Sequence, residues 1–148
     1  MRAQATEWAA NQSVSMIEAL KSIGLLSQGN KIDLKLPPSL MEHARLLAQK
    51  SKVQMGGAGD LNLLYSASKL SDAKNILETG VAYGWSSLAI LASISDKNDA
   101  KLISIDMPYP KMNNEDFVGV VVSDYLRSKW NLIREPDRNG INKALNKF

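Results

Sequence analysis

The hydrophobic positions in the first part of the chain recur with helical spacing. Val14, Ile17 and Leu20 are three residues apart, so they would lie on one face of a helix. This spacing predicts an amphipathic helix over about 6–23, with Thr6 as its capping residue.

A different pattern follows at 31–36, where apolar residues occupy every second position. This alternation is typical of a short strand or an extended arm with one buried face. Two prolines end it, and Pro38 favours the start of another helix over about 39–50. We interpret residues 1–58 as an N-terminal helical extension or lid, and residues 59–148 as the main domain.

Helical and extended patterns alternate through the rest of the chain. Asp60 is placed to cap a helix over 61–70. Nearer the end, residues 117–129 predict a bend followed by a short helix, and the apolar run 130–133 predicts a strand. A last helix is expected over 141–148.

Between these segments, residues 74–106 predict one strand–helix–strand unit. An apolar strand ends at Glu78, a loop bracketed by Gly80 and Gly84 follows, and the apolar run after the loop suits a helix packed on a sheet. A second apolar strand then ends at Asp106. Because ligands bind at the carboxyl ends of strands in open α/β sheets, this unit predicts a ligand site at that edge.

The bulk composition narrows the classes of function. The chain has 148 residues, of which 45% are hydrophobic and 22% charged, which is typical of a globular protein. A net charge of +3, spread along the chain, gives no reason to expect nucleic acid as a partner. The absence of cysteine excludes disulfides and cysteine zinc sites. Without a membrane-spanning run or a secretion-like start, we expect a cytoplasmic protein with no membrane partner.

The glycine loop can be compared with known phosphate-binding patterns. The dinucleotide fingerprint G-x-G-x-x-G that begins at Gly80 requires two further glycines, where this chain has Ala82 and Trp85. No Gly-Lys-Ser/Thr follows, so the P-loop pattern is missing as well. The carboxylate of Glu78 disfavours a pyrophosphate but suits a ligand that bears a cation or hydroxyls, and Asp106 at the end of the next strand can accept both hydroxyls of a ribose. S-adenosyl-L-methionine combines a sulfonium, an ammonium and an adenosine, and it fits both acids.

The same residues carry a family resemblance. Residues 76–91 resemble the first motif of class I S-adenosylmethionine-dependent methyltransferases, acid-x-Gly-x-x-x-Gly-x-Ser, and residues 102–110 resemble their second motif. The chain is similar to the O-methyltransferase-like branch called methyltransferase domain family 24, from about residue 60 to its end. The resemblance implies a Rossmann-like α/β fold and methyl transfer to an oxygen of a small-molecule acceptor or sugar.

The resemblance also implies roles for single residues. Glu78 and the two glycines would form the loop on the methionine side, and Ser86 with Ser87 would hydrogen-bond the ligand or cap the helix. Asp106 would hold the ribose and Met107 would line the adenine. The residues implied in cofactor binding are Glu78, Thr79, Gly80, Gly84, Ser86, Ser87, Asp106, Met107 and, near the adenine amine, Asp137. No catalytic residue and no metal ligand is assigned.

The sheet of that family has more strands than this chain supplies. Its acceptor site and catalytic residues come mostly after the third parallel strand, so we expect a fold truncated there, or a second copy or partner chain that covers the open sheet edge. Two other functions remain open. One is an NAD-dependent oxidoreductase, because the 22 residues from Gly84 to Asp106 suit a ribose-binding acid. The other is a non-catalytic half-domain that acts as an interaction module.

Overall fold

The computed structural model describes residues 2–27, 34–107 and 113–148. The chain divides into two compact units, Met1–Asp33 and Leu34–Phe148, and each is described by itself. Helix α3 (Pro38–Ala48) begins at the proline that favours a helix start, and it packs within the second unit. The role of residues 1–58 as a lid stays a prediction.

The first unit has helices α1 (Arg2–Asn11) and α2 (Met16–Ser22) where the sequence pattern predicted one. Ser15 caps α2, because its Oγ accepts from the Glu18 amide at 3.2 Å and its own amide donates to the Glu18 carboxylate at 2.9 Å. This capping box holds Ser15 in an extended conformation and interrupts the helix. The prediction of a single helix capped by Thr6 was therefore wrong.

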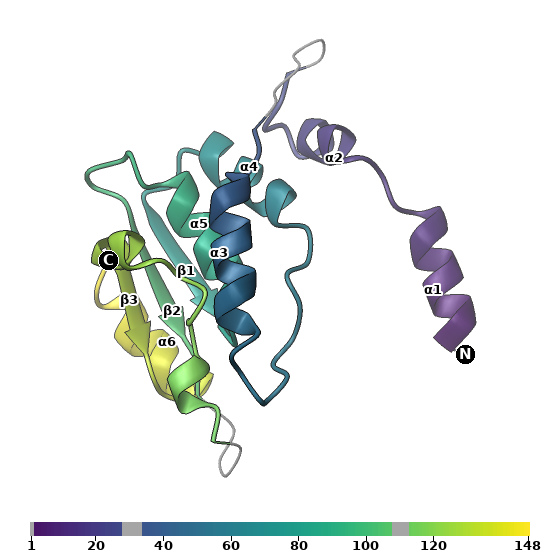
Figure 1. Cartoon of the computed structure of the whole chain (residues 1–148). Helices are drawn as coiled ribbons and strands as arrows, with labels where there is room; N and C mark the ends of the chain where they lie inside the picture. The colour runs from purple at the N-terminus through teal and green to yellow at the C-terminus, as the bar shows by residue number, and fades with distance from the viewer. Residues whose placement is uncertain (1, 28–33, 108–112) are drawn as a thin grey trace. The chain divides into compact units, whose positions relative to one another are not determined.

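The second unit is built on a parallel sheet in the order β1-β2-β3, drawn in Figure 1. Its strands are β1 (Asn75–Thr79), β2 (Lys101–Ile105) and β3 (Trp130–Ile133). Glu78 of β1 lies opposite Ser104 of β2. The three predicted strands are confirmed, and with them the α/β fold class.

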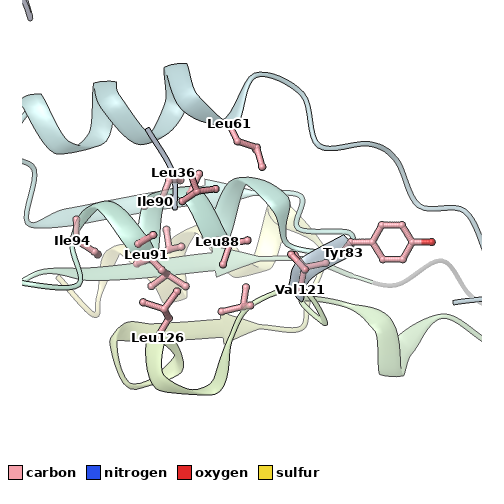
Figure 2. Packing of buried hydrophobic residues seen from close by; sticks show 14 of the residues in the cluster. Leu36, Leu61, Tyr83, Leu88, Ile90, Leu91, Ile94, Val121 and Leu126 are labelled. Atoms are coloured by element: carbon pink, nitrogen blue, oxygen red, sulfur yellow. The ribbon is translucent and has the colours of Figure 1, made fainter. Parts of the chain in front are cut away.

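Two helices lie on one side of the sheet. These are α4 (Leu61–Leu70), which Asp60 caps as predicted by accepting from the Leu63 amide at 3.0 Å, and α5 (Trp85–Ser93). Helix α5 lies against the strands, and α4 packs on α5. Helix α5 is buried over nearly its whole surface, as expected for a helix between a sheet and a second helix layer. Figure 2 shows its side chains, among them Leu91, at the centre of the main hydrophobic core.

Helix α6 (Asp137–Leu145) packs on the other face of the sheet, over β2 and β3. It begins earlier than the predicted 141–148, directly after Pro136. The prediction placed Gly140 in a loop, but this glycine lies inside the helix and allows a close approach to the sheet. A Cβ atom at Gly140 would lie 2.5 Å from Cγ2 of Ile105.

The remaining segments connect these layers. Two short 3₁₀ helices, Glu115–Phe117 and Asp124–Lys129, confirm the predicted bend and short helix before β3. The predicted short strand or extended arm at 31–36 lies partly outside the described residues, and its described end is not a strand. There, the Leu36 amide donates to the side chain of Asn62 at 3.0 Å. None of the helices in the described ranges has the length and apolar character to cross a membrane.

Candidate functional site

The carboxyl ends of the three parallel strands lie at the same end of the sheet, and a pocket of about 380 Å³ lies there. Because the loops that follow parallel strands all lie at this carboxyl end, residues far apart in the sequence come together. The structure thus brings four predicted site residues into one pocket. Its lining is Met55, Gly80, Val81, Ala82, Asp106, Met107 and Asp137.

Asp106 holds the loop that follows β1. Its Oδ2 accepts hydrogen bonds from the amides of Val81, at 2.5 Å, and Ala82, at 2.7 Å. Its own amide donates to the carbonyl of Ile133 at 3.0 Å, so the acid is tied to β3 as well. Both loop bonds end on Oδ2, which leaves the lone pairs of Oδ1 out of this contact.

The glycine loop itself is shaped by its packing on a later segment. Ala82 adopts a left-handed conformation with φ 49°, and its carbonyl accepts from the Gly119 amide at 2.8 Å. Gly84 also has a positive φ, of 90°, and a Cβ there would lie 2.9 Å from Cα of Gly119. The predicted site residue Gly84 therefore permits a close backbone approach, and it does not line the pocket.

The Glu78 carboxylate accepts hydrogen bonds from three serine hydroxyl groups. Ser86 Oγ donates to Oε1, Ser87 Oγ donates to Oε2 at 2.6 Å, and Ser104 Oγ also donates to Oε2 at 2.6 Å. The prediction that Ser86 caps α5 was wrong, because Gly84 is the N-cap and provides no side-chain cap bond. Both serines instead tie the first turn of α5 to the end of β1.

Five of the nine predicted cofactor-binding residues are absent from the pocket lining. These are Glu78, Thr79, Gly84, Ser86 and Ser87. A contact between any of them and a ligand stays a prediction.

Sequence reasoning missed Met55, which lines the pocket from the loop between α3 and α4. Two contacts hold this loop: Tyr83 Oη donates to the Val53 carbonyl, and Asn114 Nδ2 lies 2.9 Å from Met55 Sδ. A methionine in an irregular loop carries no pattern that would have indicated its place. A signal did exist for Ser104, since a polar residue inside an apolar strand needs a hydrogen-bond partner when buried.

The electrostatic character of the pocket follows from its lining. Asp106 and Asp137 contribute carboxylates, and none of the lining residues in the described part of the chain is cationic. Such a surface attracts a positive centre and hydroxyl donors, and it repels phosphate. Within 2–27, 34–107 and 113–148, no group of three or more His, Asp and Glu side chains is arranged to hold a metal ion.

Solved structures of known proteins share this arrangement of elements. The SAH-bound Podospora anserina methyltransferase PaMTH1 is similar with a TM-score of 0.54 and 19% sequence identity, over 85% of this chain and 53% of that one. Cofactor-bound Rv0187 from MTB is similar with a TM-score of 0.51 and 12% identity, over 89% of this chain and 56% of that one. The likeness shows a Rossmann-like fold of the methyltransferase type, and the chain spans about half the length of these structures. No protein-family model and no curated protein matches the sequence.

Proposed function

We propose that residues 34–148 bind S-adenosyl-L-methionine and that the protein transfers its methyl group to a small-molecule acceptor. The observation that carries this proposal is the pocket that joins the loop after β1 to Asp106 and Asp137, where the described lining residues include two carboxylates and no cation. The fold shared with the SAH-bound methyltransferase supports it. An oxygen of a small molecule or sugar as the acceptor is supported by the motif resemblance of residues 76–91.

Five of the lining residues have a role in this proposal. Asp106 accepts the ribose hydroxyls through Oδ1, since Oδ2 is bound to the loop. Met55 and Met107 provide apolar contact for the adenine, and Asp137 accepts from its amine. Gly80 has φ 77° and no atom within 4 Å of a Cβ position, so its backbone stays open to the ligand.

The bound cofactor supplies a methyl group made electrophilic by the sulfonium. The contribution of the chain is to hold that methyl group in line with an acceptor, and positioning of two reactants can provide much of the rate enhancement. The carboxylates orient the nucleoside. We assign no catalytic residue among the described residues.

The loop geometry counts against the nicotinamide alternative. A dinucleotide site needs free amides and a close glycine backbone for the pyrophosphate. Here the amides of Val81 and Ala82 donate to Asp106, and Ala82 adds a methyl group. A pyrophosphate would also face the carboxylates of the pocket.

Calorimetry with S-adenosylhomocysteine and with NADH tests the proposal. We expect the full chain to bind S-adenosylhomocysteine with a Kd of about 10 μM, or about −7 kcal/mol, and to show no binding of NADH. Asp106→Ala should abolish binding, because it removes both the ribose acceptor and the loop contact. Asp72→Ala, at an exposed acid away from the pocket, serves as the matched control. A chain that is folded by circular dichroism but binds no S-adenosylhomocysteine would refute the proposal.

A second candidate function is pairing with another chain through the sheet edge. Among the described strands, β1 pairs only with β2, and Leu77 of β1 is 37% exposed. An unpaired edge of this kind is a template for strand addition. Light scattering behind size exclusion tests it: a concentration-dependent dimer that Leu77→Lys disrupts would support edge pairing, and a monomer at all concentrations would contradict self-pairing.

A further inference from the structure

Ser104 is a fully buried hydroxyl in the middle of the sheet. Its Oγ donates to Oε2 of Glu78 at 2.6 Å and accepts from Nε1 of Trp130 at 2.8 Å. A hydroxyl has a single proton, and an indole Nε1 can only donate. The Trp130 bond therefore determines which way the Ser104 proton points, and it points to Glu78.

The Trp130 ring is itself fixed in place by its neighbours. A Cβ atom on Gly119 would lie 2.2 Å from the ring, so the ring packs directly on that backbone. The Arg127 guanidinium lies 5.3 Å from the ring centroid and donates to the Gly119 carbonyl at 2.8 Å. Because the ring is held in this way, its N–H group has a defined direction.

We propose that Trp130 and Ser104 are positioning residues that preset the Glu78 carboxylate for the cofactor. A carboxylate offers about four acceptor sites on its two oxygens, and the three serine hydroxyls occupy three of them. The one that remains is the site that can accept from a cationic group of the ligand, such as the ammonium. This inference rests on the proposed function, and it adds two residues that do not line the pocket.

The first test is the affinity of the full chain for S-adenosylhomocysteine, measured by calorimetry. We expect Ser104→Ala and Trp130→Phe each to raise the Kd about tenfold, the effect of losing one hydrogen bond in a network that ends on a charge. The controls are Ser93→Ala, which removes a buried hydroxyl bonded to the Ile90 carbonyl, and Trp8→Phe. These controls should leave the Kd within about twofold.

A double-mutant cycle with Glu78→Gln separates positioning from general packing. If Ser104 acts through Glu78, then Ser104→Ala changes the Kd by less than about twofold in the Glu78→Gln background. Fully additive effects would overturn the inference. Wild-type binding with an unchanged Kd in Ser104→Ala and Trp130→Phe would overturn it while leaving the proposed function intact, and no wild-type binding would overturn both.

A fluorescence measurement without ligand tests the hydrogen bond between Trp130 and Ser104, and it can be made on variants that bind no S-adenosylhomocysteine. In a Trp8→Phe, Trp85→Phe background, Trp130 is the remaining tryptophan. Ser104→Ala should shift its fluorescence emission, because the indole N–H loses its acceptor. Ser93→Ala should not, and an unchanged emission in Ser104→Ala would contradict the proposed bond.

Discussion

Two carboxylates at the ends of neighbouring strands support the site in different ways. Asp106 holds the loop after β1 through two backbone amides. Glu78 holds the first turn of α5 through Ser86 and Ser87. Each acid therefore fixes the backbone beside it before any ligand arrives, and such preorganisation lowers the entropy cost of binding.

At the residue scale, Gly84→Ala tests how tightly the loop is packed. The change forces a side chain into φ 90° and against Cα of Gly119, so we expect a loss of about 2 kcal/mol in the free energy of unfolding. Gly57→Ala is the control, because no atom lies within 4 Å of its Cβ position. Urea denaturation measures both, and equal losses would show that close packing at Gly84 is unimportant.

Single residues also show which features of the candidate site can be predicted from the sequence. The position of Asp106 at a strand end could be predicted, because an apolar run followed by an acid has a clear pattern. The partners of Ser86 and Ser87 could not, because they depend on where α5 begins relative to β1. The contact between Glu78 and Ser104 required the register of two strands that lie 26 residues apart in the chain.

At the scale of whole elements, capping residues determine where the helices begin. Asp60 was identified correctly because it stands alone before an apolar run. Ser15 was overlooked because several polar residues precede α2 and the helical spacing continues across them. The sequence predicts a start of α6 that is too late, because a glycine such as Gly140 is typical of a loop, whereas close packing on Ile105 requires it inside the helix.

The cap of α4 can be tested directly. Asp60→Ala removes the acceptor for the Leu63 amide, so we expect a loss of about 1 kcal/mol in the free energy of unfolding. Asp60→Asn keeps an acceptor oxygen at the same position, so its free energy of unfolding should fall by only a few tenths of a kcal/mol. Thermal and urea unfolding followed by circular dichroism measure the difference, and an equal loss in both variants would argue against capping.

At the scale of the whole molecule, charges are divided between the two ends of the second unit. The carboxyl ends of the strands carry the acidic pocket, whereas ion pairs join the loops at the amino ends of β1 and β2. These pairs are Lys69–Asp96 at 2.7 Å, Lys74–Asp99 at 2.5 Å and Lys97–Asp72 at 2.9 Å. These three pairs are thus separate from the candidate ligand site, whereas a further pair joins Lys143 of α6 to Glu135 in the loop after β3.

These ion pairs predict how stability depends on pH. Hydrogen bonds from the paired lysines lower the pKa values of Asp72, Asp96 and Asp99. A carboxyl group with a lowered pKa in the folded state contributes stability above its unfolded pKa, near 4, and loses it as pH falls through the folded value. The melting temperature should therefore fall as pH drops below about 4.

Replacing Asp72, Asp96 and Asp99 together by asparagine measures how much these three residues contribute to the pH dependence of stability. Its melting temperature should decline less between pH 5 and pH 2 than that of the wild type, by a small margin because exposed pairs are weak. Asp116→Asn, at an exposed acid, is the control and should follow the wild-type curve. A triple variant with the same pH profile as the wild type would contradict a contribution from the pairs.

Gly140 has a consequence that reaches across the sheet. It lies about one turn from Asp137 on α6, and its missing side chain lets the helix rest directly on Ile105. Any added bulk on that hidden side would push the helix outward and carry Asp137 with it. The width of the candidate pocket thus depends partly on how α6 packs on the sheet. Under the proposed function, a larger residue at position 140 should change cofactor affinity without altering any residue that lines the pocket.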